Sequence, residues 1–190
     1  MRCLTDTESE AWFAAAGIKI GKYRHISFPQ GALKRRCLFL PNLELGISDL
    51  GRLCTQLVDW LPNGCERMLW LTNWATYQPD PTILFESLRR ACDENRHIID
   101  APGHLFESSP YDRQDYDTRT KRDHAENTLI WAFLLLIIAC QLGGYLVAPN
   151  GDCIELDDTS LSISSTDDTK IREAYELAAR FDLKFHEQAA

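Results

Sequence analysis

Apolar side chains recur every three or four residues in several stretches of the chain, the spacing expected of a helix with one buried face. The clearest case predicts a helix from Ser48 to Leu61, ended by Pro62-Asn63-Gly64. Other patterns predict helices over residues 7–16, from Asp80, over about 121–142, and from Thr166 or Asp167. The expected inner face of the last helix consists of Ile171, Ala174, Tyr175, Ala178 and Phe181.

The helix over residues 121–142 contains the most apolar run of the chain, residues 129–140. This run is too short to span a bilayer, so it is expected to be the buried middle of a long helix. An aspartate at Leu135 would then place an unpaired charge in the core and unfold the protein.

Alternating or continuous apolar segments predict the strands. They are expected at residues 18–28, 33–40, 68–73, 145–148, 153–156 and 161–164. Pro149-Asn150-Gly151-Asp152 lies between two of them and predicts a hairpin. The order of the elements predicts an α/β protein of the α+β kind: a mixed β-sheet packed with helices, one long buried helix, and a C-terminal hairpin or meander followed by a helix.

The 190 residues, 45% of them hydrophobic, are enough for one sizeable core. We therefore expect a single α/β domain over residues 1–190. A polar stretch over residues 107–120 is expected to be an exposed loop insertion.

The formal net charge of −8 argues against a nucleic-acid-binding protein, which needs a cationic surface. The charge is uneven: residues 1–40 hold seven Lys or Arg against three acids, whereas residues 151–190 hold ten acids against four bases. The basic run Lys34-Arg35-Arg36 could contact phosphate, but it is expected on an edge strand, where lysines commonly prevent aggregation.

The seven cysteines are odd in number and form no CxxC pair, which fits a reducing cytoplasm. The N-terminus lacks the apolar core of a signal peptide, and we expect no association with a membrane.

Polar residues at the end of one predicted strand, and a loop that follows later, predict a possible ligand or catalytic site. Thr72, Asn73 and Trp74 end the strand, Tyr77 follows, and His104 stands after Pro102-Gly103. Ligands bind beyond the carboxyl ends of strands in open α/β sheets, so Asn73 and His104 could line one pocket, with His104 as a general base. The alternative is that both side chains only fix the turn by hydrogen bonding.

Metal and cofactor sites are not predicted. His124 and Glu126 are two residues apart on a helix and face different ways. Asp112, Asp115 and Asp117 lack the glycine and glutamate of a calcium loop. No glycine-rich phosphate loop follows a strand.

Leu69-Trp70-Leu71-Thr72-Asn73-Trp74 and Ala101-Pro102-Gly103-His104-Leu105-Phe106 resemble the "LWxTxW" strand and "APGHLF" loop of a family of small uncharacterised bacterial proteins. The resemblance covers roughly residues 66–165, and the chain departs from it in its longer polar insertion near residues 108–120. It implies a bacterial, cytoplasmic origin and no particular chemistry.

Three hypotheses follow. The first is a non-enzymatic acidic protein that binds a basic protein partner, as an immunity protein neutralises a toxin, using Asp157, Asp158, Asp167 and Asp168. The second is a small enzyme or ligand-binding protein with its site around Thr72, Asn73, Trp74, Tyr77 and His104. The third is a homo-oligomer that uses one face of the helix bearing Trp131 and Phe133.

Overall fold

The computed structural model describes residues 2–3, 6–21, 25–38, 45–62, 67–73, 105–107, 130–139, 143–157 and 159–187. All statements about the structure concern these residues. The predicted helix from Asp80, most of the loop over residues 107–120 and the first part of the helix over residues 121–142 lie outside them.

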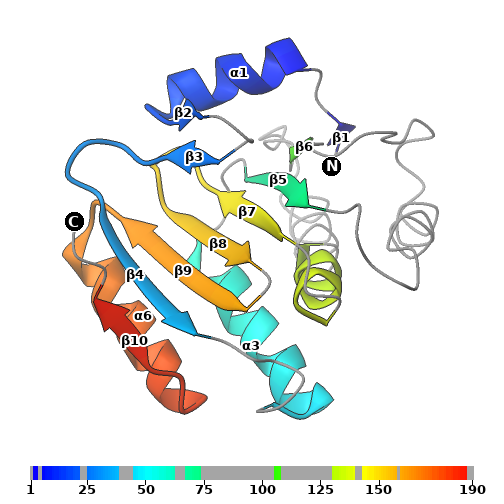
Figure 1. Cartoon of the computed structure of the whole chain (residues 1–190), viewed down its shortest axis with the longest axis vertical. Helices are drawn as coiled ribbons and strands as arrows, with labels where there is room; N and C mark the ends of the chain where they lie inside the picture. Colours follow the sequence, from blue (N-terminus) through cyan, green and yellow to red (C-terminus); the bar gives the residue numbers. More distant parts are fainter. Residues whose placement is uncertain are drawn as a thin grey trace, which may run out of the picture.

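An eight-stranded sheet forms the centre of the described structure (Figure 1), in the order β1-β6-β5-β7-β8-β9-β4-β10. All pairings described in it are antiparallel. In chain order the strands are β1 Arg2–Cys3, β4 Leu33–Leu38, β5 Met68–Asn73, β6 Leu105–Glu107, β7 Gly143–Val147, β8 Cys153–Asp157, β9 Ser160–Ser165 and β10 Phe185–Glu187. The predicted α+β class is confirmed, including the C-terminal meander that leads into a helix.

Helices cover both faces of this sheet. Three of them, α3 (Ile47–Trp60), α6 (Asp168–Arg180) and the helix over residues 130–139, contribute to one core cluster with the sheet. Helix α1 (Asp6–Ala15) and a small separate sheet of β2 (Lys19–Ile20) and β3 (Ile26–Ser27) contribute to a second cluster. Figure 1 shows α3 and α6 behind the sheet and α1 at its upper end.

Alternation along the strands separates the two clusters. On β5, Leu69 belongs to the cluster with α3 and α6, whereas Met68 and Trp70 belong to the cluster with α1. Leu146 and Tyr145 on β7 divide in the same way. Successive strand residues point to opposite faces, so these apolar segments face a core on each side.

Helix α3 confirms the helical pattern of the sequence. Leu53, Cys54 and Leu57 are fully buried on one face. A side chain at Gly51 would come within 3.4 Å of the Trp131 ring, and the Trp131 indole donates to the Gly51 carbonyl at 2.9 Å. Gly51 therefore lies at the contact between α3 and the helix over residues 130–139.

Three expectations about buried or extended residues were wrong. Leu135 is only partly buried, whereas Ile137 two residues later is fully buried. Tyr175 is 39% exposed because it lies at the margin of the sheet, and Leu177 is buried in its place. The strand expected over residues 18–28 is divided between β2 and β3, with the Gly21 N–H donating to the His25 carbonyl at 2.6 Å.

The predicted hairpin joins β7 to β8. The Ala148 N–H donates to the Asp152 carbonyl at 2.9 Å, and the Gly151 N–H donates to the Ala148 carbonyl at 2.9 Å. Gly151 has φ +88°, a conformation that glycine adopts without strain. The hairpin signal is therefore confirmed.

Strand β10 was not predicted, and it follows an unusual helix end. The N–H groups of Asp182 and Leu183 donate to the carbonyls of Ala179 and Ala178 at 3.3 and 2.9 Å, the pattern of a Schellman motif. Asp182 has φ +53° at the position where glycine is usual. The motif turns the chain back so that β10 pairs with β4.

Replacement of Asp182 by glycine is expected to stabilise the fold by about 0.5–1 kcal/mol, because it relieves the left-handed backbone conformation. Asp182→Ala, which keeps the strain and loses the carboxylate, is the matched control and should not stabilise. Urea unfolding of both variants measures the difference. Equal stability of the two would contradict the account of this turn.

Within the described residues, no helix is both long and apolar enough to cross a membrane.

Candidate functional site

Of the residues predicted at the sheet rim, Thr72 and Asn73 belong to β5, and His104 directly precedes β6 in the sequence. Trp70 on β5 pairs with Leu105 on β6, so the residue that follows His104 lies opposite the strand that ends in Asn73. The pairing register of β5 with β7 shifts between Leu71 and Asn73, which places a bulge or irregularity at Thr72. Bulges re-aim side chains and are frequent beside binding sites.

The geometry of this rim is only partly described. Trp74, Tyr77 and His104 lie outside the described residues, and of Thr72 and Asn73 only the backbone is described. The rule that ligands bind at the carboxyl ends of strands concerns parallel sheets, whereas these strands are antiparallel. The convergence of Asn73 and His104 therefore stays a prediction.

The predicted acidic residues lie at two ends of one strand. Asp157 is the last residue of β8 and pairs with Ser160, the first residue of β9. Asp167 and Asp168 follow Ser165, the last residue of β9. Strand β9 has six residues, and at about 3.3 Å per residue the two ends are too far apart to form one patch. Asp158 lies outside the described residues.

Two of these acids also have structural partners. Asp167 is the N-cap of α6 and accepts from the Thr169 N–H at 2.7 Å. The Asp157 carboxylate lies 3.6 Å from the Arg36 guanidinium. Asp168 is exposed in the first turn of α6, where a negative charge is favourable.

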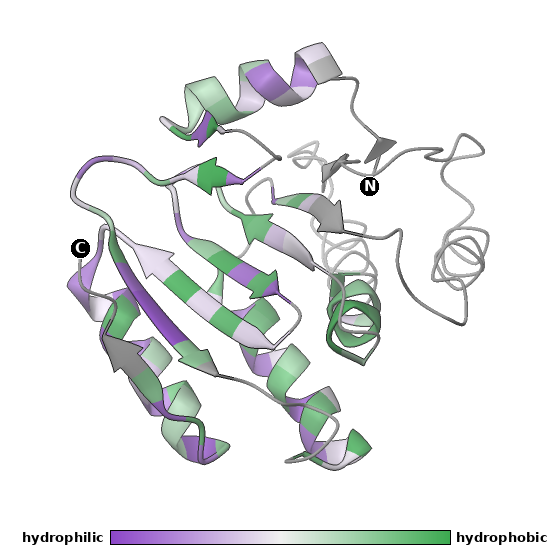
Figure 2. Ribbon diagram, viewed as in Figure 1, coloured by the Kyte–Doolittle hydropathy of each residue, from purple (hydrophilic) through white to green (hydrophobic). Residues whose placement is uncertain are grey.

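The basic run Lys34-Arg35-Arg36 lies inside the sheet and not at its edge. Strand β4 pairs with β9 on one side and with β10 on the other, so the expectation of an edge strand was wrong. Figure 2 shows β4 as a hydrophilic strand next to the alternating colours of β9 and β8. Residues paired across these strands share a face, and the register brings Lys34 and Arg36 of β4 onto the same face as the acidic residues of β8.

We call this surface the polar strip, defined as Lys34, Arg36, Glu155, Asp157, Ser160, Ser162 and Ser164. Lys34 forms an ion pair with Glu155 across β9. Arg36 reaches Asp157 in the same direction and donates to the Ser160 hydroxyl at 2.7 Å. The basic segment over residues 1–40 and the acidic segment over residues 151–190 therefore neutralise each other in part within the sheet.

The small serines of β9 make these cross-strand pairs possible. Ser160, Ser162 and Ser164 are at most 2% exposed although they face the charged side chains. A short side chain leaves room for the long side chains of β4 to extend over it toward β8. The hydroxyls of Ser162 and Ser164 have no hydrogen-bond partner among the described residues.

Arg35 points to the other face of β4 and is held at the margin of the sheet. Its Nε donates to the Tyr175 hydroxyl at 2.7 Å. The Tyr175 ring in turn packs edge-on against Phe185 of β10, with 5.6 Å between the ring centroids. All three basic side chains of β4 are thus engaged within the protein.

A partly buried hydrogen-bond chain continues from the polar strip to His25, directly before β3. The Tyr145 hydroxyl donates to Glu155 at 2.9 Å, and its oxygen lies 3.2 Å from Nδ1 of His25. Because the phenol proton is directed to Glu155, His25 is the donor in the second contact. Burial, with the nearby Glu155 carboxylate, raises the pKa of Tyr145 well above its ordinary value, so Tyr145 stays protonated.

Two of the buried cysteines, Cys54 and Cys153, have thiols whose pKa is raised by their surroundings. Burial raises the pKa of the Cys54 thiol from 9.0 to about 12, and a backbone hydrogen bond opposes this only in part. Burial, followed by the Glu155 carboxylate, also raises the pKa of Cys153. A thiol must ionise to act as a nucleophile, so neither residue is suited to that role.

The high pKa of Cys54 predicts a loss of stability in alkali. The unfolded thiol ionises above about pH 9 while the folded one does not, so stability that is complete below pH 9 falls by about 1.4 kcal/mol per pH unit toward pH 12. Urea unfolding at pH 7, 9 and 10.5 should show a steeper loss above pH 9 for the wild type than for Cys54→Ala. Parallel losses would contradict the burial of this thiol.

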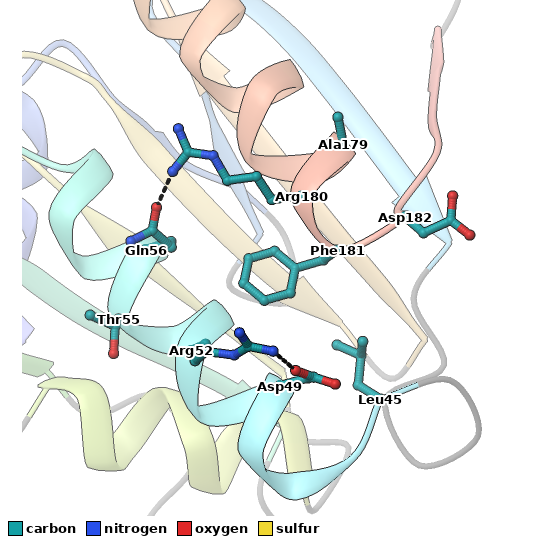
Figure 3. A pocket seen from close by; sticks show the side chains of 9 residues that line it. All are labelled: Leu45, Asp49, Arg52, Thr55, Gln56, Ala179, Arg180, Phe181 and Asp182. Carbon is teal, nitrogen blue, oxygen red and sulfur yellow. Dashed lines mark hydrogen bonds and ion pairs between the residues drawn. The ribbon is translucent and has the colours of Figure 1, made fainter.

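A groove lies between α3 and the end of α6, on the face of the sheet that these two helices cover (Figure 3). It measures about 610 Å³ and is lined from both helices and from the segment before α3: Leu45, Asp49, Arg52, Thr55, Gln56, Ala179, Arg180, Phe181 and Asp182. The sequence pattern did not predict this groove, because α3 and α6 are more than 100 residues apart in the chain.

The described part of the chain contains no group of three His, Cys, Asp or Glu side chains that could hold a metal ion.

Comparison of the chain with protein-family models, with curated proteins and with solved structures gave no match. The resemblance to the "LWxTxW" and "APGHLF" family therefore stays an expectation.

Proposed function

We propose that the chain is a non-enzymatic interaction protein that binds a basic protein partner, in the manner of an immunity protein that neutralises a toxin. The proposal includes a bacterial and cytoplasmic setting. It rests on which charges the protein presents to solvent.

The observation that carries the proposal is that exposed acidic side chains outnumber exposed basic ones among the described residues. Nine described acidic side chains are exposed, namely Glu8, Glu10, Asp59, Asp157, Asp167, Asp168, Glu173, Glu176 and Asp182. Five basic ones are exposed: Lys19, Arg52, Arg172, Arg180 and Lys184. Because Lys34, Arg35 and Arg36 are only partly exposed and bonded internally, the surface that the described residues leave to a partner is mainly acidic. Such a surface attracts a basic partner and speeds its association.

Helices α3 and α6 offer the best residues for a test. Asp59 lies next to Trp60, whose carbonyl accepts from Lys170 at 2.8 Å, and Lys170 also contacts Glu173 at 2.9 Å. Asp59, Glu173 and Glu176 are exposed and none of them caps a helix. Asp157 and Asp167 are unsuitable, because their replacement would remove a cross-strand ion pair and the cap of α6. The pair of Glu173 with Lys170 joins only neighbouring turns of α6 at the surface, so its loss is expected to affect the fold little.

The experiment is affinity capture from the bacterial host, followed by reconstitution with the purified captured protein. The triple variant Asp59→Lys, Glu173→Lys, Glu176→Lys should lose one specific basic protein that the wild type retains. The matched variant Arg172→Glu, Lys184→Glu should retain it. A captured protein that is acidic, or that binds the acid-to-lysine variant equally well, would contradict the proposal.

The second candidate, an enzyme or ligand-binding protein with its site at the sheet rim, is favoured by the pairing of Trp70 with Leu105 and by the register shift at Thr72. It predicts that His104→Ala and Asn73→Ala abolish binding of the same ligand without lowering stability. Loss of stability in both variants would instead indicate a structural role for these residues.

A further inference from the structure

We propose that the groove between α3 and α6 binds a small organic carboxylate with an apolar body. The proposal is independent of the acidic surface and its partner. It rests on the two arginines and the aromatic ring that meet in the groove (Figure 3).

The two arginines reach the groove from opposite walls. Arg52 comes from the middle of α3 and is oriented by an ion pair with Asp49, one turn earlier on the same helix. Arg180 comes from the last turn of α6 and donates to the Gln56 side chain at 2.6 Å. Each guanidinium has five N–H donors, so both keep donors for a ligand while each is held by one contact with a side chain of α3.

An apolar surface lies between these donors. Figure 3 shows the Phe181 ring between the side chains of Arg180 and Arg52. Phe181 and Leu45 are partly buried and pack against the main core cluster, so both are held in place. A volume of about 610 Å³ is in the range of small-molecule sites, which combine apolar walls with a few placed polar groups.

The charges in the groove favour a monoanion over a dianion. Two arginines and two aspartates line the groove, and Asp49 offsets one positive charge by its ion pair with Arg52. The carboxylate of Asp182 points away from both guanidiniums in Figure 3. The C-terminal end of a helix also disfavours anions, but the Ala178 and Ala179 carbonyls of α6 are satisfied by the N–H groups of the turn that follows. One carboxylate therefore matches the site better than a phosphate dianion.

The experiment measures binding of phenylacetate, indole-3-acetate and 4-methylvalerate to the full chain by NMR titration and calorimetry. Their uncharged amides serve as matched probes. At least one carboxylate is expected to bind saturably, with shifts centred on Arg52, Arg180 and Phe181, and its amide at least about tenfold more weakly. Absence of saturable binding by all three carboxylates, or equal binding of an amide, would overturn the proposal.

Single substitutions of arginine distinguish binding in the groove from non-specific electrostatic attraction of a carboxylate. Arg52→Gln and Arg180→Gln should each weaken binding about tenfold. The control Arg172→Gln removes an exposed arginine of α6 that does not line the groove and should leave binding unchanged. Equal weakening in all three variants would show non-specific attraction and overturn the proposal. Binding of the basic partner serves as an independent readout, so failure of the groove is distinguishable from failure of the proposed function.

Discussion

Replacement of Ile137 by aspartate is expected to abolish folding. Ile137 is fully buried in the cluster that joins α3, α6 and the sheet. An unpaired carboxylate at this position would cost several kcal/mol, against a total stability of about 5–15 kcal/mol for a domain. The variant should lack a cooperative thermal transition when followed by circular dichroism.

The same helix provides the control for this prediction. Ala139 is exposed, so Ala139→Asp should remain folded with nearly unchanged stability. Leu135→Asp should have an intermediate effect because Leu135 is only partly buried. A cooperative, wild-type-like transition for Ile137→Asp would mean that the helix over residues 130–139 does not pack as described.

Removal of the Glu155 carboxylate is expected to give the second-largest loss. Glu155 accepts from the Tyr145 hydroxyl at 2.9 Å and forms the ion pair with Lys34. Glu155→Ala leaves a phenol that is almost fully buried, and a half-buried ammonium group, each without this acceptor. The expected loss in the free energy of unfolding is about 2–3 kcal/mol.

A double-mutant cycle measures how much of this loss belongs to the ion pair. Lys34→Ala, Glu155→Ala and the double variant should give a coupling energy of about 1 kcal/mol. Glu155→Gln, which keeps an acceptor for Tyr145, should lose less than Glu155→Ala. Additive effects of the two alanine substitutions would contradict the cross-strand pair.

Local patterns in the sequence predicted much of the fold. The 3.6-residue period from Leu50 to Leu61 gave the buried face of α3, and Asn150-Gly151 gave the β7–β8 hairpin. These elements depend on neighbouring residues, so a single sequence can reveal them. Strand β10 could not be found in this way, because three residues carry little periodicity and its partner β4 is about 150 residues away.

The polar strip was hidden for the same reason. The polar residues of the strip occupy every second position of their strands, which is a weak signal of a shared polar face. They are Lys34 and Arg36 on β4, Glu155 and Asp157 on β8, and the three serines of β9. Only the register of β4, β9 and β8 brings them together, and register between distant strands depends on the whole sheet. Without the register, the sequence predicts an edge strand for Lys34-Arg35-Arg36 and one common surface for the C-terminal acids.

The most direct test of the central claim, that acidic residues outside the sheet attract a basic partner, is the salt dependence of the association rate constant. With the purified partner, stopped-flow measurements between 50 and 500 mM NaCl should show a fall of about tenfold or more for the wild type. The variant Asp59→Lys, Glu173→Lys, Glu176→Lys should associate slowly at every salt concentration. A wild-type rate that is independent of salt would contradict the account.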